Sequence, residues 1–313
     1  MASKSKAEKI VVPEKRSYNA VSIPTEIIIN IIMILFCAAC VVPFLFVIII
    51  SFTSEQSIAQ LGYSFTPMSY SIDAYTYAFN MGAALWRSYF NSFFVTVLGT
   101  AFSVFICALY SYALFRRDFK YRRFFTFFSF FTMLFGGGLV PTVVVCKQLL
   151  GLTDNYAAII VPMLCNPFNF IVMRTFFQSS VPEELIEAAA IDGSGEYNTL
   201  FKIILPISKP GIATIALLNA LAYWNEWYIP MLYIRDNKYK PLQQLLMEIQ
   251  RNVEYLAKNA ASMGAEASKA LATTPTQSLR MALVVMCVVP IAFAYPFFQR
   301  YIIAGLTVGS VKG

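Results

Sequence analysis

A short run of aromatic, amide and carboxylate side chains is the strongest candidate for ligand chemistry in this chain. Its members are Tyr223, Trp224, Asn225, Glu226, Trp227 and Tyr228. Aromatic rings pack against the apolar faces of a sugar, while amide and carboxylate groups bind its hydroxyls. Two other interpretations stay open, because Trp and Tyr also form belts at membrane interfaces and Asn225 or Glu226 can hold helices together or lie at a helix end. We treat the run as a candidate substrate pathway.

No pattern typical of an enzyme accompanies this run. The chain contains no histidine, which removes histidine-based triads and histidine metal sites. A phosphate-binding G-x-x-x-x-G-K-[ST] loop is absent as well, so the chain does not hydrolyse ATP itself. The six cysteines lie within or at the ends of apolar runs, where a thiol behaves as a small hydrophobic group. We therefore expect a protein that is not an enzyme and binds neither a metal nor a cofactor.

A polar stretch at residues 180–210 has the pattern of two short helices joined by a turn. Ser180 and Glu183 have the spacing of a capping box at the start of the first helix. Gly193 ends that helix, since glycine adopts turn conformations that other residues resist. A second, amphipathic helix follows and closes at Pro206. The acidic polar face of the stretch disfavours the alternative of a helix pair that lies on the lipid surface.

The fixed residues of this stretch resemble the E-A-A-x3-G-x9-I-x-L-P loop of ABC importer permeases, at every specified position from Glu187 to Pro206. The resemblance implies that the loop docks on a separate ATPase and transmits its movement to the membrane. The residues that it assigns to this coupling are Glu187, Ala188, Ala189, Asp192, Gly193, Ile203, Leu205 and Pro206. ATP and Mg²⁺ would be bound by the partner ATPase and not by this chain.

Other parts of the chain resemble the carbohydrate-uptake branch of these permeases, the maltose-permease type. The similar residues are the run 222–227 and the tail 305–313, and the G-G-G-L-V-P run at 136–141 resembles a subgroup for aldouronates and other complex oligosaccharides. This implies a type I importer fold, a second and different permease chain in a heterodimer, two ATPase subunits, an extracellular solute-binding protein and a sugar cargo. Nucleic acid is not an expected partner.

Two alternatives to a sugar importer are open from the sequence. One is an ABC permease for a solute that is not a sugar. The other is a gradient-driven secondary transporter, which would often contain internal repeats or ion-coupling carboxylates at mid-membrane depth. Neither feature is visible in this sequence, which favours the ATP-driven class.

The composition indicates the elements that must position these residues, because 58% of the chain is hydrophobic and only 13% is charged. A membrane-crossing helix needs roughly 20 mainly apolar residues to cover the hydrocarbon core. Six stretches meet this requirement, and we predict an all-α protein of the cell membrane with six transmembrane helices. The predicted spans are residues 27–51, 89–115, 124–145, 156–177, 211–234 and 281–303.

The net charge of +7 helps to orient the spans, since Lys and Arg in short loops stay on the cytoplasmic side. Basic residues cluster before the first span, at residues 116–123 and in the polar stretch, which places both termini and that stretch in the cytoplasm. The loop 235–280 breaks the rule, because it is rich in Lys and Arg yet must face outside. The basic residues of the other loops nevertheless decide the predicted orientation.

The domain organisation that we predict has two parts. Residues 1–24 form a basic cytoplasmic arm of unassigned role, and residues 25–313 form the permease domain with a coupling loop at 180–210 and an outer loop at 235–280. Apolar residues in the outer loop recur at helical spacing and predict an amphipathic helix. These residues are Leu242, Leu245, Leu246, Ile249, Val253 and Leu256. That helix contacts either the solute-binding protein, as the resemblance implies, or only its own subunit.

Overall fold

A computed structural model describes residues 22–259 and 275–310. Nearly all of the predicted basic arm, the centre of the outer loop and the last three residues of the tail lie outside the described residues. Within the described ranges the chain is helical, and its only β-type pairing is a single antiparallel bridge between Thr53 and Tyr70. The all-α prediction is therefore confirmed for this part of the chain.

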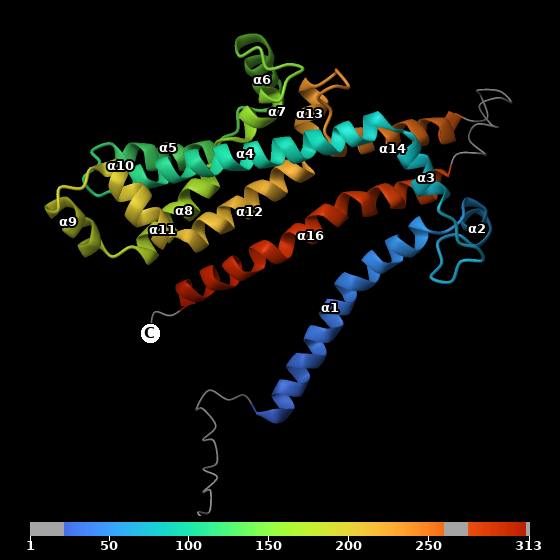
Figure 1. The fold of residues 1–313 in the computed structure, drawn as a ribbon, viewed down its shortest axis with the longest axis horizontal. Coiled ribbons are helices and arrows are strands. Elements are labelled where there is room, and N and C mark those ends of the chain that lie inside the picture. Colours follow the sequence, from blue (N-terminus) through green and yellow to red (C-terminus); the bar gives the residue numbers. More distant parts are fainter. Residues whose placement is uncertain (1–21, 260–274, 311–313) are drawn as a thin grey trace, which may run out of the picture.

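Three helices are long and apolar enough to cross a membrane without interruption. They are α1 (Ile23–Ser51), α4 (Ala83–Phe115) and α16 (Thr276–Ser310), and they contain the first, second and sixth predicted spans. α1 packs against α16, and Figure 1 shows the N-terminal half of α1 running away from the rest of the bundle. Most of its side chains are exposed, as expected for a helix whose surroundings are lipid.

The third predicted span is divided between two helices. α5 (Arg122–Leu134) and α6 (Leu139–Val144), which runs on into a π-helical turn η1 (Val145–Leu149), meet at an angle of 113°. The three glycines at 136–138 separate them. Gly138 has a φ of +84°, a conformation that side chains resist, so the chain turns sharply there.

The fourth and fifth predicted spans are also interrupted. α7 (Ala157–Ile160) and the short η2 (Val161–Met163) meet α8 (Pro167–Ser180) at 55°, where the Asn166 side chain caps α8. In the fifth span, α12 (Lys209–Asn225) ends well before the predicted residue 234, and α13 (Tyr228–Tyr233) begins anew. The third bent pair is formed by the helical segment Glu196–Ile207 and α12, which meet at 83°, and counting each bent pair as one span raises the number of candidate spans in the described residues to six.

The core forms where α4 packs between α8 and α12. Close approach depends on glycine at two positions, because an added Cβ would lie 2.6 Å from the Tyr223 ring at Gly99 and 2.7 Å from the Phe176 ring at Gly211. Polar pairs cross the same interface, including Asn169 Nδ2 to Asn219 Oδ1 at 3.2 Å. Small residues and interhelical hydrogen bonds hold helices together in lipid, where apolar contact alone gives little preference.

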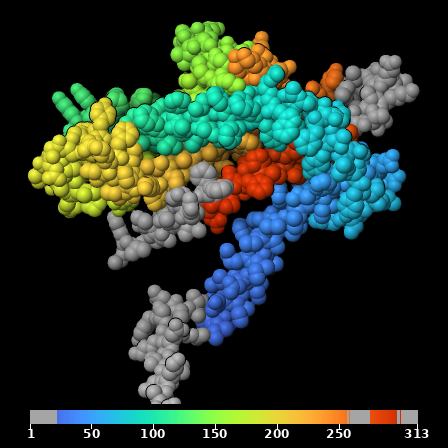
Figure 2. All heavy atoms as spheres, in the orientation of Figure 1, coloured from blue at the N-terminus to red at the C-terminus, as the bar shows by residue number. Residues whose placement is uncertain are grey.

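The two predicted loop regions lie at opposite ends of the bundle (Figure 1). One end carries α9 (Glu183–Ile191) and α10 (Glu196–Asn198) of the polar stretch. The other end carries α2 (Glu55–Leu61), α3 (Asp73–Asn80) and α14 (Leu242–Asn259). α14 packs against α4 and α16, and α2 and α3 pack against α16. The space-filling view in Figure 2 shows these small elements gathered around the end of the long helices.

Candidate functional site

The polar stretch folds as the predicted helix, turn and helix. α9 ends in a Schellman motif, in which the Ser194 amide donates to Ala189 O and the Gly193 amide donates to Ala190 O. Gly193 has a φ of +75°, and no other atom approaches the place of a side chain there. The glycine is therefore required by the backbone turn and not by crowding.

One local prediction for this stretch was wrong. Ser180 is the last residue of α8, so it forms no capping box; Pro182 precedes α9 without a side-chain cap. The acidic residues Glu183 and Glu184 in the first turn supply the favourable charge that a cap would have given. The second helix runs from α10 through the π-helix η3 (Thr199–Ile204) into α11 (Leu205–Ile207) and ends one residue after the predicted Pro206.

One face of this helical hairpin is anchored in the bundle and the other is free. Leu200 and Ile204 are fully buried among residues of α4, α8 and α12. Of the predicted coupling residues, Ala189 is buried and Ile203 and Leu205 are half-buried, and the remaining five are exposed. Two apolar side chains near the turn are also highly exposed to solvent, Ile191 at 87% and Tyr197 at 78%. Exposed apolar groups rimmed by polar ones are typical of a protein interaction surface.

Charged residues after α4 hold both helices of the hairpin. Arg116 Nη2 lies 3.0 Å from Glu196 Oε1 and 2.6 Å from Asp118 Oδ2, and Arg117 Nη1 lies 2.8 Å from Glu183 Oε2. The hydrogen bond from Arg116 lowers the pKa of Asp118. Arg116, Arg117, Asp118 and Glu183 line a cavity of about 530 Å³ beside α9. From the sequence, Arg116 and Arg117 indicated only the orientation of the spans, because Glu183 and Glu196 are distant from them along the chain.

The aromatic run 223–228 is divided by the fold. Tyr223 is buried and its hydroxyl donates to Ile160 O at 3.1 Å, with Ser103 Oγ at the same distance. Trp224 is buried too, and its Nε1 donates to Cys287 O at 3.2 Å. These two side chains join helices of the bundle, whereas Asn225 and Trp227 line a cavity.

Glu226 is a helix cap in this structure. Its Oε1 accepts hydrogen bonds from the Tyr228 and Ile229 amides at 2.8 and 2.9 Å, at the start of α13. This arrangement is the helix-end alternative that the sequence left open, and it explains why the helix breaks inside the fifth predicted span. Tyr228 is exposed and its ring packs edge-on against Trp227.

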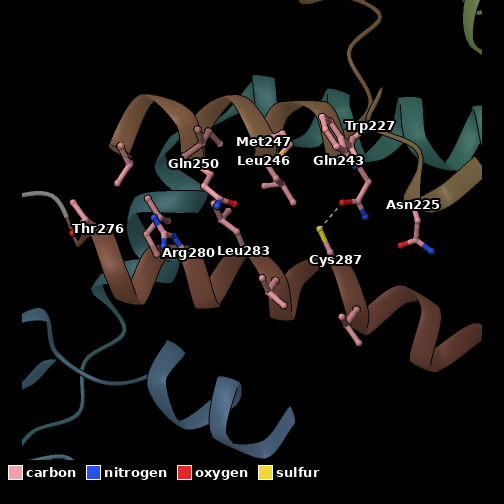
Figure 3. Close-up of a pocket in the computed structure, with 15 residues that line it drawn as sticks. Asn225, Trp227, Gln243, Leu246, Met247, Gln250, Thr276, Arg280, Leu283 and Cys287 are labelled. Carbon is pink, nitrogen blue, oxygen red and sulfur yellow. Dashed lines mark hydrogen bonds between the residues drawn. The ribbon is translucent and has the colours of Figure 1, made fainter. Parts of the chain in front are cut away.

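A cavity of about 240 Å³ lies between α14, α16 and the end of α12 (Figure 3). Its walls are mostly aliphatic, and its polar side chains come from Asn225, Gln243, Gln250, Thr276 and Arg280. The apolar face of α14 covers this chain's own helices, since Leu242 and Leu246 are buried against α4 and α16. The apolar face of α14 thus packs on its own subunit, which was one of the two alternatives. Sequence reasoning missed Gln243 and Arg280, because only the pairing of α14 with α16 brings them together.

Residues 105–308 match the family described as "Binding-protein-dependent transport system inner membrane component". The chain is 39% identical over 281 residues to the polygalacturonan/rhamnogalacturonan transport system permease protein YtcP of Bacillus subtilis (strain 168), covering 90% of this chain and 96% of that protein. It is 28% identical to the trehalose/maltose transport system permease protein MalG of Thermococcus litoralis, covering 92% and 97% of the two chains.

A solved structure is also similar over nearly the whole described fold. It belongs to a bacterial ABC transporter involved in the import of the acidic polysaccharide alginate, and the similar chain has 30% sequence identity and a TM-score of 0.76. The similarity covers 90% of this chain and 99% of that one.

Proposed function

This chain belongs to the binding-protein-dependent transport inner membrane component family, and we propose that it forms one half of the channel of an ATP-driven importer of oligosaccharides. It is a permease subunit and a multi-pass protein of the bacterial cytoplasmic membrane. The observation that carries the proposal is the helical hairpin from α9 to α11. It is anchored by Leu200 and Ile204, it presents exposed apolar and acidic groups, and its sequence has the pattern of an ATPase-docking loop.

The proposed topology has six spans with both termini in the cytoplasm. Three uninterrupted helices and three bent pairs supply six candidate crossings, with α12 as the membrane part of the pair that begins in the hairpin, and this supports an even count. The distribution of Lys and Arg supports the direction. The hairpin and the cavity beside α14 would then lie on the cytoplasmic and the outer side respectively.

The proposed assembly contains a second, different permease, two cytoplasmic ATPase subunits and an extracellular solute-binding protein. ATP and Mg²⁺ bind to the ATPase subunits in this proposal, and their closure moves the hairpin. The coupling residues are Glu187, Ala188, Ala189, Asp192, Gly193, Ile203, Leu205 and Pro206. Five of the eight are exposed, which leaves them free to contact a partner.

An oligosaccharide is the proposed cargo because similar permeases are named for polygalacturonan, rhamnogalacturonan, trehalose or maltose transport. Within the run 223–228, we assign contact with the cargo to Asn225 and Trp227, which line the cavity beside α14. Tyr223, Trp224 and Glu226 support that position through the hydrogen bonds already described. The polar face of α14 is the proposed contact for the solute-binding protein.

The test is uptake of trigalacturonate by proteoliposomes that contain the permease pair, the ATPase and the binding protein. We expect uptake to require ATP and to be lost on Glu187→Lys, with membrane insertion and assembly of the permease pair unchanged. Glu184→Lys on the same helix is the matched control. Uptake that persists without ATP would contradict the importer and favour a gradient-driven transporter, whereas ATP-dependent uptake of only non-sugar solutes would overturn the cargo.

A further inference from the structure

Arg280 has more hydrogen-bonding capacity than its described neighbours use. A guanidinium carries five N–H donors. In the described residues Arg280 makes one ion pair, from Nη2 to Glu254 Oε1 at 3.0 Å, and its Nε is buried without an acceptor. A buried donor without a partner costs free energy that an incoming acceptor would recover. The ion pair with Glu254 therefore positions Arg280, while its Nε has no acceptor among the described residues.

The cavity beside Arg280 has its charged group towards one end and its aromatic group at the other. Figure 3 shows Arg280 and Gln250 towards one end and Asn225 and Trp227 at the other, with Gln243 next to Cys287. Arg280 and Cys287, which both line the cavity, are seven positions apart on α16, so about 10 Å of helix separates them. The volume of about 240 Å³ suits one or two small rings and not a long chain.

The amide side chains that line this cavity retain free groups. Asn225 Nδ2 donates to Leu221 O and Gln250 Nε2 donates to Glu254 Oε1, which leaves both amide oxygens without a donor among the described residues. Gln243 Oε1 faces Cys287 Sγ at 3.7 Å, and its amide nitrogen is unused there. Apolar walls with a few free polar groups and one aromatic ring match a ligand that is apolar on its faces and polar on its edges.

Arg280 is the one charged residue among the described residues that line the cavity. A lipid tail would leave the Arg280 guanidinium unsatisfied and a sugar hydroxyl would supply only a neutral acceptor, whereas a carboxylate would supply an acceptor of opposite charge and therefore a stronger hydrogen bond. Arg251 lies close by, with its guanidinium carbon 5.9 Å from the centre of the Trp227 ring, and adds a second positive charge on the same side of the bundle.

We propose that this cavity binds the end of an acidic oligosaccharide, with a uronate carboxylate on Arg280 and the adjoining sugar ring on Trp227. Asn225, Gln243 and Gln250 bind the ring hydroxyls between these two points. The site rests on the proposed function, because it names the chemical class of the cargo and the residues that select it. It also requires no other chain, since all of its residues come from α12, α14, α16 and the segment after α12.

The test measures binding directly, without the solute-binding protein, so that the selectivity of that protein does not enter. The permease pair with its ATPase is placed in nanodiscs, and binding of trigalacturonate and of its fully methyl-esterified form is followed by equilibrium dialysis. The ester keeps the ring and removes the charge. We expect the wild-type complex to bind the acid more tightly than the ester, by about tenfold or more for a charge-assisted hydrogen bond.

Arg280→Gln should remove that preference and leave binding of the ester unchanged, while Arg280→Lys should keep part of it. Lys258→Gln is the matched control, because it removes a positive charge from the exposed surface of α14 and does not line the cavity. Equal binding of acid and ester by the wild-type complex, or no saturable binding of either, overturns the inference. An equal loss of both ligands in Arg280→Gln and Arg280→Lys also overturns it, because a general collapse of the site would have that effect.

Failure of this site and failure of the proposed function give different results. ATP-dependent uptake of trigalacturonate by the complete transporter, together with no acid preference in the nanodisc measurement, rejects the cavity and retains the importer. Uptake that does not depend on ATP rejects the importer.

Discussion

Arg116 Nη2 lies 3.0 Å from Glu196 Oε1, and this ion pair joins the end of α4 to the first turn of α10. The Tyr112 hydroxyl donates a hydrogen bond to the other oxygen of the same carboxylate. α8 and α12 pack around α4. A displacement of the hairpin is therefore transmitted to the centre of the bundle through Glu196 as well as through the buried Leu200 and Ile204.

We expect Glu196→Gln to weaken the coupling between ATP hydrolysis and transport while leaving basal hydrolysis unchanged. The pair is partly solvated, with the Glu196 side chain 60% exposed, so its contribution is about 1 kcal/mol or less. The measurement compares substrate-stimulated with basal ATPase rates. Glu184→Gln, an exposed acid on the same hairpin, is the control, and an equal effect of the two variants would argue against a specific role of the pair.

Gly193→Ala should destabilise the hairpin by about 1 kcal/mol, because an L side chain at a φ of +75° is strained. Space is not the reason, since no atom lies within 4 Å of the added Cβ. Gly195→Ala is the matched control, as Gly195 has a φ of −71° and equally open surroundings. Affinity for the ATPase should fall in the first variant and not in the second, and equal losses would show that the turn conformation is unimportant.

Gly99→Ala should separate α4 from α12, because the new Cβ would lie 2.6 Å from the Tyr223 ring. Overpacking of this kind costs about 1–3 kcal/mol. Thermal unfolding of the purified permease pair in detergent measures the loss, and Gly136→Ala, where nothing lies within 4 Å, is expected to have no comparable effect. A Gly99→Ala variant with unchanged unfolding temperature would contradict the close packing.

The length of the apolar runs and the distribution of charged residues made much of this architecture predictable from the sequence. α1, α4 and α16 contain predicted spans because each has a long uninterrupted apolar run. The positions of the breaks were not visible, since a run of apolar residues has the same pattern on both sides of residues 136–138 or of Glu226. Glu226 looked like an intramembrane carboxylate, and only the hydrogen bonds to Tyr228 and Ile229 identify it as a cap.

The candidate sites were predictable to different degrees for the same physical reason. The hairpin is local in sequence, so its turn at Gly193 and its helical spacing were visible without a structure. The cavity is not local, because Trp227, Gln243 and Arg280 come from three separate segments. No periodicity in one segment reports which side chains a distant helix will bring beside it.

Glu55→Ala should destabilise the end of the bundle that carries α2. The Glu55 carboxylate accepts hydrogen bonds from the Gln277 and Ser278 amides at 3.0 and 3.2 Å, and thereby caps α16 from another helix. Loss of such a cap costs about 0.5–2 kcal/mol. Hydrogen exchange of the first turn of α16 should rise, whereas Gln56→Ala, at an exposed neighbouring position, should not change it. Unaltered exchange in Glu55→Ala would show that the cap is redundant.

Acid should release the Arg116–Asp118 pair only below the ordinary titration range of an aspartate. The pKa of Asp118 is lowered by the hydrogen bond from Arg116, so the pair stabilises the folded chain fully above about pH 4 and loses this contribution as the pH falls through the lowered pKa. Unfolding temperature measured from pH 7 to pH 3 checks this. Asp118→Asn should remove the part of the acid-dependent fall in unfolding temperature that comes from this pair. A contribution of the pair that is already lost at pH 5 would contradict the lowered pKa.

The contact between Glu55 and α16 also bears on how the protein is made. Glu55 and Thr276 are 221 positions apart, and α1 packs on α16 along the same side of the bundle. During translation the first helix enters the bilayer long before its partner leaves the ribosome. Until then the side of α1 that faces α16 is covered by lipid, and this end of the bundle can close only after α16 has been made. Premature termination before α16 would therefore leave an inserted chain whose earliest helix has no docking site.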